Sequence, residues 1–226
     1  MKFDEWEPIY EAILADMGYD RTGDESSRDW LATRVQSLDR ASTDCAGTVA
    51  IAGAAPTLED EASLARRADH VVAASDAGAR LDAVGVRPDL VVTDLDGDPA
   101  ATVELARDGV PVVVHAHGDN RDALERWVPE IPSAALYGTT QAAPIGSLVN
   151  VGGFTDGDRA AFLADHLGAH TLTFPGWAFD VDDSDKRRKL HWAARLLHWL
   201  ERRRDESFTV LDGRREQLSL AQFPDP

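Results

Sequence analysis

Six short apolar stretches alternate with helical segments along most of this chain. Val, Ile, Leu and Ala dominate these stretches, and glycine-rich or acidic turns follow most of them. Such alternation is typical of parallel strands joined by crossover helices, in a sheet covered on both faces. We therefore predict a doubly wound α/β fold with a mostly parallel sheet of about six strands. The predicted strands lie at residues 48–52, 71–74, 90–93, 110–115, 148–151 and 171–174.

Local signals mark the ends of several helices between these strands. Asp98 followed by Pro99 predicts a helix N-cap with proline at the first helical position. Gly85, Gly109 and Gly168 stand where helix C-termini are expected. Each signal separates a predicted helix from a predicted strand, which supports the alternating pattern.

Further segments flank the alternating region. Apolar residues recur at helical spacing from Phe3 to Met17 and again after Ser26, which predicts two N-terminal helices. We expect a long helix after Ser184 and then a short C-terminal hairpin around Asp212-Gly213. The predicted division is an N-terminal helical extension (1–45), a central α/β domain (46–206) and a C-terminal tail or hairpin (207–226).

The charge balance is strongly acidic. The chain has 40 acidic and 23 basic residues, for a net charge of −17, and only three of the basic residues are lysines. This composition resembles that of proteins from a salt-loaded, haloarchaeal-type cytosol, because a Debye length of ~3 Å at 1 M salt screens self-repulsion. A basic surface for nucleic acid is not expected.

The sequence also limits compartment and cysteine chemistry. The first residues lack the basic-then-apolar pattern of a signal peptide, and the apolar runs fall short of the ~20 residues that span a bilayer. We therefore expect a cytoplasmic protein without membrane association. Cys45 is the single cysteine, which excludes an intramolecular disulfide and a cysteine-rich zinc site.

Asp94 and Asp96 directly follow one of the predicted strands. In an extended segment they share one face, so their carboxylates can converge on a hard cation such as Mg²⁺. The alternative is that the two acids merely cap a buried strand. Further acids, Asp119, Asp156 and Asp158, lie in turns after other apolar stretches and are candidates for the same site. Because Mg²⁺ takes one or two protein carboxylates, they cannot all be direct ligands, and Asp158 can equally be a helix cap.

Two other patterns indicate an anionic ligand. Lys186 and Lys189 lie three residues apart on one predicted helical face, with Arg187 between them, and this arrangement suits a polyphosphate. A solvated basic face that offsets nearby aspartates is the alternative. The turn that begins at Gly53 can hold an anion on backbone N–H groups, although a simple tight turn explains it equally well. His117 is expected to line the site as a loop residue.

Taken together, these segments resemble one family, the archaeal 6-hydroxymethyl-7,8-dihydropterin pyrophosphokinases. More remotely, they resemble the catalytic domain of thiamine pyrophosphokinases. The resemblance runs in order from about residue 48 to 200, although the usual G-x-G-P-S-L of the archaeal family reads differently here. The segments that carry it are 53–59 (GAAPTLE), 75–79 (SDAGA), 87–97 (RPDLVVTDLDG), 115–120 (HAHGDN), 152–160 (GGFTDGDRA) and 186–190 (KRRKL).

The resemblance implies transfer of diphosphate from ATP to 6-hydroxymethyl-7,8-dihydropterin, with release of AMP, on a route to folate or methanopterin. Asp94, Asp96 and Asp119 are the implied Mg²⁺ ligands, and Asp156 and Asp158 are further catalytic candidates. The resemblance leaves room for a homo-oligomer. Trp177 and Phe179 can stack on the pterin or simply pack. The implied nucleotide-binding residues are Gly53, Ser75, Asp76, His117, Asn120, Lys186, Arg187 and Lys189.

Two alternatives remain open. Asp94-Leu95-Asp96-Gly97 is similar to the nucleophile motif of haloacid-dehalogenase-type phosphatases, in which the first aspartate becomes phosphorylated. That motif normally follows the first strand, whereas two predicted strands precede it here. The second alternative is a nucleotide-binding module that lacks catalysis.

Overall fold

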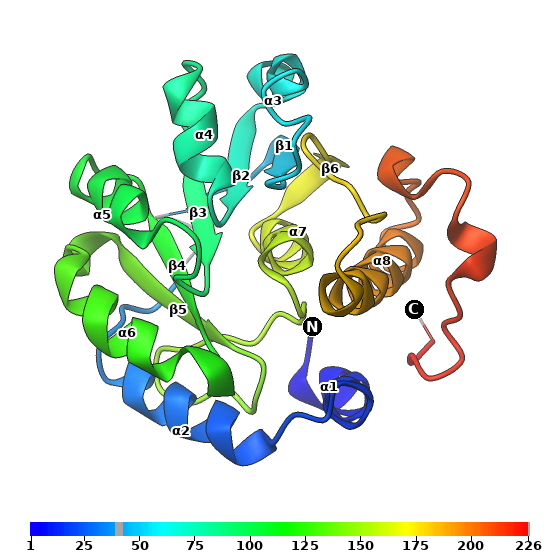
Figure 1. Ribbon diagram of the computed structural model, residues 1–226, viewed down its shortest axis with the longest axis horizontal. Helices are drawn as coiled ribbons and strands as arrows, with labels where there is room; N and C mark the ends of the chain where they lie inside the picture. The colour runs from blue at the N-terminus through cyan, green and yellow to red at the C-terminus, as the bar shows by residue number, and fades with distance from the viewer. Residues whose placement is uncertain (39–42, 226) are drawn as a thin grey trace.

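The computed structural model describes residues 1–38 and 43–225, and its centre is one six-stranded sheet (Figure 1). The strand order is β5-β4-β3-β2-β1-β6, and all adjacent strands are parallel. The predicted doubly wound α/β fold is confirmed. The strands are β1 (Gly47–Ala52), β2 (His70–Ala74), β3 (Leu90–Thr93), β4 (Val112–Ala116), β5 (Leu136–Thr140) and β6 (Ala169–Thr173).

The topology places helices on both faces of the sheet. From β1 to β5 each new strand is added on the same side, and the chain then crosses back to place β6 beside β1. Because parallel crossovers are right-handed, reversing the direction moves the connecting helix to the opposite face. The first layer is α3 (Ala62–Arg67), α4 (Ala77–Ala83), α5 (Pro99–Arg107) and α6 (Arg121–Trp127), and the second includes α7 (Asp156–His166) and α8 (Ser184–Arg203).

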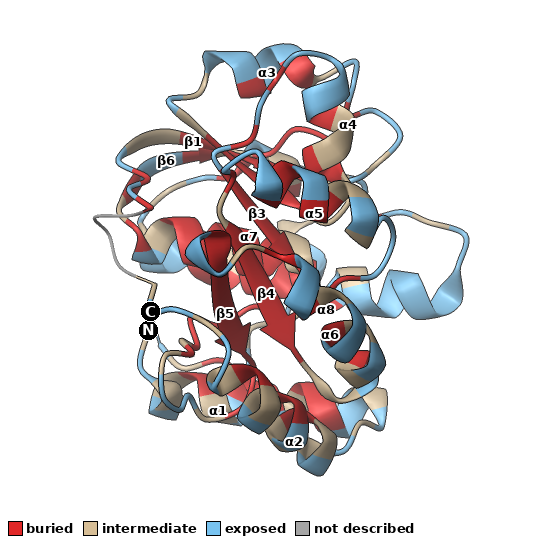
Figure 2. Ribbon diagram, turned by 90° about the vertical axis from the view of Figure 1, so that its left-hand side faces the viewer, coloured by how far each residue is buried: buried red, intermediate tan, exposed pale blue. Residues whose placement is uncertain are grey.

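Alternate residues of a strand pack with different helix layers. On β1, Ala50 and Ala52 share a cluster with α3 and α4, whereas Val49 and Ile51 share a cluster with α7 and α8. Both faces of the strand are therefore apolar and buried, which explains why the strands read as continuous apolar runs. Figure 2 shows the buried strands at the centre between exposed helix surfaces.

The two N-terminal helices, α1 (Phe3–Met17) and α2 (Arg21–Ala32), pack against the sheet and its second layer. Trp6, Ile9 and Tyr10 of α1 belong to the same core cluster as α7 and α8. α2 contacts β4 and β5, and Gln36 after it forms a parallel bridge with Tyr137 of β5. These helices therefore complete the core at the β5 side of the sheet (Figure 1).

The predicted strand at 148–151 is wrong. The fifth strand is instead β5, and Val149 forms only an isolated bridge with Thr139. The β5 sequence contains Gly138 and two threonines, so its apolar signal is weak, yet it is wholly buried because α2 and the loop around Leu148 cover it. A Cβ atom at Gly138 would lie 2.5 Å from Leu148 Cδ2, so the glycine allows this close cover.

The predicted C-terminal hairpin is also wrong. Residues 207–225 contain two short 3₁₀ turns, Thr209–Leu211 and Arg215–Gln217, and the described part of this tail forms no strand. Phe208, Leu211 and Leu218 are buried in the core cluster of α7 and α8. The tail is therefore held by side-chain burial rather than by strand pairing.

Several smaller features follow the sequence closely. Asp98 caps α5 by accepting a hydrogen bond from the Ala101 N–H at 3.0 Å, and Pro99 begins the helix. Gly85 and Gly109 adopt positive φ just after the ends of α4 and α5. Within the described residues, none of the helices is long and apolar enough to span a membrane.

Candidate active site

The carboxyl ends of all six strands meet at one edge of the sheet, and the turn after β3 lies there. Leu95 has φ 68° and a buried side chain, so Asp94-Leu95-Asp96 is a tight turn rather than the extended segment expected from sequence. The Asp96 N–H donates to Asp94 Oδ1 at 3.1 Å. This bond draws the two acidic residues together at the open edge of the sheet.

Asp156, the first residue of α7, completes a group of three carboxylates. One carboxylate oxygen from each of Asp94, Asp96 and Asp156 lies within 4.8 Å of the others. The Asp94 N–H also points to Asp156 Oδ2 at 3.3 Å. We call these three residues the acidic cluster. Its hard oxygen donors fit Mg²⁺ in their chemistry and in their convergence.

The three carboxylates differ in their electrostatic surroundings. Burial raises the pKa of Asp94, but hydrogen bonds from His117 and from the Asp96 N–H outweigh it and lower that pKa to about 2. Burial and the charge of Asp94 raise the pKa of Asp96. Burial, followed by the charge of Asp94, raises the pKa of Asp156 well above its usual value. Crowded like charges of this kind are relieved by a bound cation.

The loop after β4 supports Asp94. His117 Nδ1 accepts from the Asp119 N–H at 3.3 Å, so Nε2 carries the proton and faces Asp94 Oδ2 at 3.3 Å. The Asn120 amide donates to the Asp94 carbonyl at 2.8 Å and to the His115 carbonyl at 2.7 Å. His117 and Asn120 thus hold the β3 turn against β4. Asp119 itself is exposed and lies outside the acidic cluster.

Ser75 and Asp76 approach the cluster from the end of β2. Ser75 Oγ faces Asp96 Oδ1 at 3.3 Å, and Asp76 Oδ1 accepts from the Asp98 N–H at 2.7 Å. Gly97 has φ 69°, and a Cβ atom there would overlap the Asp76 carboxylate. The glycine therefore allows the β2 and β3 turns to meet.

Asp158 forms part of the N-terminal cap of α7. Its carboxylate accepts from the N–H groups of Phe154 and Thr155 at 2.6 and 2.9 Å, and from the Thr155 hydroxyl. The sequence allowed Asp158 to be either a helix cap or a catalytic residue, and these hydrogen bonds make it a cap. Its side chain is fully buried.

Arg159 is a site-adjacent residue that sequence reasoning missed. It is 1% exposed, donates to the Phe154 carbonyl at 3.0 Å, and carries a positive charge near Asp158, Asp156 and Asp94. A buried guanidinium offsets part of the negative charge that gathers at the start of α7. The only signal in the sequence was its position beside two aspartates in a glycine-rich turn.

A family model described as 6-hydroxymethylpterin diphosphokinase MptE-like matches residues 26–184 of the chain. The chain belongs to this family. It is 40% identical to the 6-hydroxymethyl-7,8-dihydropterin pyrophosphokinase of Methanothermobacter thermautotrophicus, across 91% of this chain and 97% of that protein. It is similar to proteins of the same name from Pyrococcus furiosus (38% identical, 89% and 95% covered) and Methanocaldococcus jannaschii (29%, 89% and 96%).

In this diphosphokinase-family chain, two N–H groups of the Gly53 turn are already hydrogen-bonded and cannot bind an anion. The Gly53 and Ala55 N–H groups donate to the carbonyls of Pro175 and Gly176, both at 2.9 Å. The turn after β1 is thereby tied to the loop after β6. The following helix α3 begins only at Ala62, so Gly53 also does not stand at a helix N-terminus.

The basic residues Lys186, Arg187 and Lys189 lie exposed in the first turns of α8. The helices that lead into and out of β6 run antiparallel to the strands, so α7 and α8 both begin at the edge where the acidic cluster lies (Figure 1). Arg187 is folded back and donates to the carbonyls of Val181 and Asp182, both at 2.8 Å. Among the described residues, no hydrogen bond or ion pair joins these three side chains to the cluster.

Trp177 lies between the turn after β1 and the start of α7. Its indole N–H donates to the Ile51 carbonyl at 2.8 Å, and Cβ atoms at Gly53 or Gly157 would meet its ring. Phe179 packs against Trp177 with ring centroids 5.7 Å apart and is buried. The structure therefore gives both aromatic residues a packing role.

Proposed function

We propose that this chain transfers diphosphate from ATP to 6-hydroxymethyl-7,8-dihydropterin, giving AMP and the pterin diphosphate. The observation that carries the proposal is the convergence of Asp94, Asp96 and Asp156 within 4.8 Å at the strand ends, in a chain of the diphosphokinase family. Ligands of open parallel sheets bind at this edge. The names of the three archaeal relatives supply the pterin substrate.

The acidic cluster is the proposed magnesium site. Asp94 and Asp96 are the primary ligands, and Asp156 faces the same point. Asp156 takes the place that the sequence analysis gave to Asp119, because Asp119 lies outside the cluster. Bound Mg²⁺ would offset negative charge on the triphosphate and on the departing AMP. His117 keeps the Asp94 carboxylate ionised and oriented through its Nε2 hydrogen bond.

The reaction consists of one displacement at phosphorus. The hydroxymethyl oxygen of the pterin forms a bond to the β-phosphorus of ATP, the bond from that phosphorus to the α,β-bridging oxygen breaks, and the hydroxyl proton is released. Lys186 and Lys189 are proposed to face the phosphates as point charges, with Arg187, Ser75 and Asn120 near the nucleotide. Such transfer depends mainly on positioning and charge stabilisation.

The test is to identify the nucleotide product with Mg²⁺, ATP and 6-hydroxymethyl-7,8-dihydropterin in molar KCl. We expect AMP to appear in step with the pterin diphosphate, and the Lys186→Ala/Lys189→Ala variant to need more ATP while still binding the pterin. ADP as product would identify an ordinary kinase. Inorganic phosphate with a phosphorylated Asp94 would identify the phosphatase alternative, and ATP binding without turnover would identify a binding module.

A further inference from the structure

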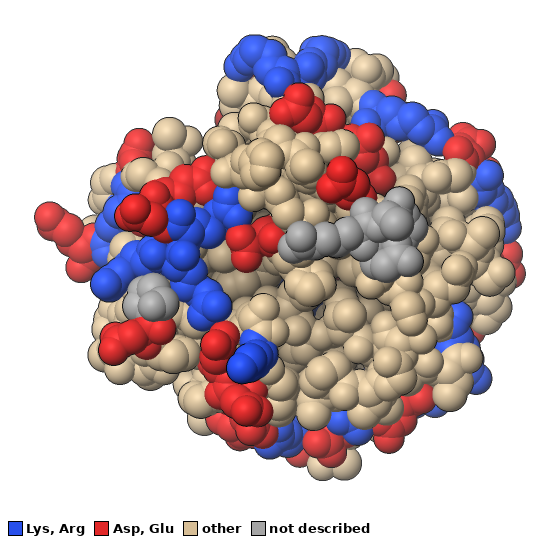
Figure 3. Space-filling model, turned by 180° about the vertical axis from the view of Figure 1, so that it is seen from behind, with Lys and Arg blue, Asp and Glu red and all other residues tan. Residues whose placement is uncertain are grey.

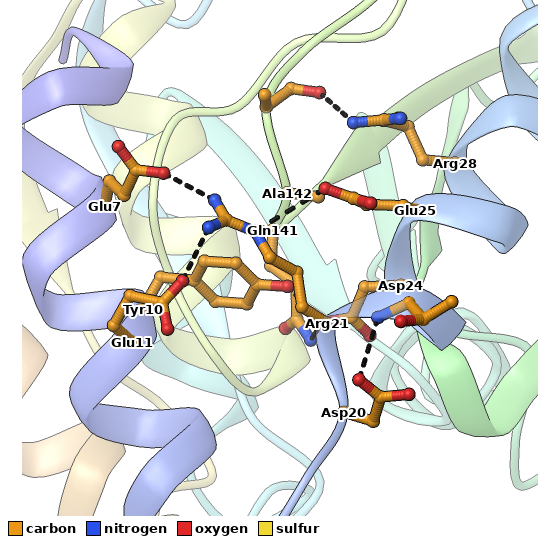
Figure 4. Close-up of polar contacts among 12 residues, drawn as sticks. Glu7, Tyr10, Glu11, Asp20, Arg21, Asp24, Glu25, Arg28, Gln141 and Ala142 are labelled. Atoms are coloured by element: carbon orange, nitrogen blue, oxygen red, sulfur yellow. Dashed lines mark hydrogen bonds and ion pairs between the residues drawn. The ribbon is translucent and has the colours of Figure 1, made fainter.

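Asp24 of α2 is a buried carboxylate that the proposed chemistry does not use. It is 3% exposed and makes three short hydrogen bonds. Oδ1 accepts from the Gly118 N–H at 2.7 Å, whereas Oδ2 accepts from the Tyr10 hydroxyl at 2.6 Å and from Gln141 Nε2 at 2.7 Å. Figure 4 shows Asp24 facing Tyr10 and Gln141 where α1, α2 and the loop after β5 meet.

These contacts make Asp24 a structural acceptor rather than a ligand of substrate or metal. Three donors from three different parts of the chain converge on its two oxygens, and water is excluded. Burial and the hydrogen bond to Asp24 raise the pKa of Tyr10, so that hydroxyl remains a donor. Hydrogen bonds to a buried charged group are strong, and losing the acceptor leaves buried donors unpaired.

The Gly118 bond connects Asp24 to the loop that supports Asp94. Gly118 lies between His117, which contacts the Asp94 carboxylate, and Asn120, which holds the Asp94 carbonyl. α2 lies directly on this loop, since a Cβ atom at Gly23 would be 3.0 Å from the Gly118 Cα. Asp24 and α2 are therefore in direct contact with the loop that carries His117 and Asn120.

The Gln141 bond connects Asp24 to the loop that leads to Asp156. Gln141 is the first residue after β5, and its carbonyl accepts from the Trp6 indole N–H and from the Asn150 amide, both at 2.9 Å. Asn150 also donates to the Ala142 carbonyl at 2.9 Å, which closes the loop on itself. This loop runs on to the start of α7, where Asp156 joins the cluster.

We propose that Asp24 is a positioning residue that holds the two loops in register, and thereby sets the separation of Asp94 and Asp156. The inference rests on the proposed function. It makes α1 and α2 part of the active-site architecture rather than a separate extension. The family model begins at residue 26, so Asp24 lies just outside the segment that it describes.

The corner between α1 and α2 is built to keep Asp24 in place. Arg21 donates to Glu7 at 2.5 Å and to Glu11 at 2.6 Å, and its guanidinium lies 5.3 Å from the Tyr10 ring centre (Figure 4). Arg28 of α2 donates to the Ala143 carbonyl at 3.1 Å in the same loop as Gln141. Both helices are therefore tied to each other and to the loop independently of Asp24.

The test compares Asp24→Ala with Asp24→Asn, Tyr10→Phe and the matched control Asp20→Ala. Asp20 is exposed and caps α2 by accepting from the Thr22 N–H, so its loss weakens the helix without contacting either loop. The readouts are Mn²⁺ binding to the protein by electron paramagnetic resonance, hydrogen exchange at the Gly118 amide, kcat and KM for ATP, and melting temperature.

We expect Asp24→Ala to bind Mn²⁺ roughly 10–100-fold more weakly, the usual effect of removing a partner that orients metal ligands. Gly118 should exchange faster, and kcat should fall with the metal affinity. Asp24→Asn retains one acceptor oxygen and should lie between Asp24→Ala and the unmodified protein. Tyr10→Phe removes one of two donors to Oδ2 and should weaken binding less. Asp20→Ala should lower the melting temperature but leave Mn²⁺ affinity unchanged.

The proposal would be overturned if Asp24→Ala bound Mn²⁺ as tightly as the unmodified protein. It would also be overturned if Asp20→Ala lost as much Mn²⁺ affinity as Asp24→Ala while the two variants had the same melting temperature. Absence of Mn²⁺ binding in the unmodified protein would overturn it as well. If Asp24→Ala fails to fold, Asp24→Asn and Tyr10→Phe decide by the same readouts. Because Mn²⁺ binding and exchange need no pterin, they separate this inference from a failure of the diphosphokinase assignment itself.

Discussion

The three carboxylates of the acidic cluster have distinct surroundings although they face one point. Asp94 is held ionised by His117, whereas Asp96 and Asp156 carry raised pKa values because of burial and the neighbouring charge. Mutual repulsion of this kind lowers the stability of the cation-free protein and favours cation binding. Substitutions within the cluster are therefore expected to change function more than folding.

Replacing Asp94 or Asp96 by Asn keeps the shape of the side chain and removes its charge. Each substitution should lower turnover by at least ~100-fold, which is roughly 2.7 kcal/mol of transition-state stabilisation. Steady-state AMP release measures the effect. Asp119→Asn is the control, because Asp119 is exposed and outside the cluster. If Asp119→Asn lost as much activity as Asp94→Asn, the metal would be held by the loop after β4.

Gly97→Ala should disturb the meeting of the β2 and β3 turns. Gly85→Ala provides the control, since Gly85 has a similar positive φ of 76° but nothing within 4 Å of an added Cβ. Left-handed strain costs about 1–2 kcal/mol at either position, whereas only Gly97→Ala also displaces Asp76. Urea unfolding should show a loss of stability in both variants, at least as large in Gly97→Ala as in Gly85→Ala. AMP release should fall only in Gly97→Ala. Equal activity in both variants would show that the Asp76 contact is dispensable.

At the scale of elements, polar contacts of the last turn of α8 and of the residues just after it cover the sheet edge and hold the tail. Arg204 donates to the His170 carbonyl at 3.0 Å, and Glu206 accepts from the Leu172 N–H at 3.2 Å, so both groups occupy the free edge of β6. Exposed edges otherwise invite pairing with other chains. Glu201 holds the tail, accepting from the Phe208 N–H at 2.8 Å and from Arg215 Nε at 2.8 Å.

Glu201→Gln should destabilise the protein in a pH-dependent way. Burial raises the pKa of Glu201, but hydrogen bonds from Arg215, the Phe208 N–H and His198 lower it overall. A lowered folded-state pKa stabilises the protein above the unfolded-state value of about 4.3, and this contribution is lost as pH falls through the folded pKa. Urea unfolding should show a deficit of about 1–3 kcal/mol at pH 7 that shrinks near pH 3.

Glu216→Gln is the control for this experiment, because Glu216 lies exposed in the same tail. Its stability should match that of the unmodified protein at both pH values. A deficit in Glu201→Gln that is as large at pH 3 as at pH 7 would show that shape rather than charge holds the tail.

The predicted division of the chain into three segments remains a prediction, although the tail and α1 share one core cluster with α8.

For the whole molecule, the main long-range interaction is electrostatic repulsion among the excess acidic residues. The chain carries a net charge of −17, and on the face seen in Figure 3 Lys and Arg side chains lie among Asp and Glu side chains. Salt weakens such exposed ion pairs, each worth ~1 kcal/mol or less, but it also screens the repulsion of all the excess acids. With so large an excess, relief of repulsion should exceed the loss of ion pairs.

The melting temperature should therefore rise substantially from ~0.1 M to molar KCl, as screening shortens the Debye length from ~10 Å to ~3 Å. Differential scanning calorimetry measures the change, and a non-electrolyte at equal osmolality is the control for solvent exclusion. A flat or falling curve would contradict the haloarchaeal interpretation of the composition.

Local information in the sequence determined most of the parallel sheet and part of the site. Apolar runs with helical segments between them specified five of the six strand positions. The signal is strongest for β2, β3 and β4, which are buried along nearly their whole length, whereas the edge strand β6 leaves His170 and Thr171 exposed. Asp94 and Asp96 are neighbours, so their convergence needed only a tight turn. The strand β5 escaped detection because its burial depends on α2 and Leu148, which lie elsewhere in the chain.

The distant residues of the candidate site come together through the path of the folded chain. Asp156 reaches the cluster because reversal of strand order brings the start of α7 over β3, and no local pattern distinguishes it from Asp119. Asp24 meets Gly118 and Gln141 from a helix that precedes the first strand. The periodicity of a sequence indicates which face of a helix or strand is buried. Which distant residues meet depends on the path of the whole chain.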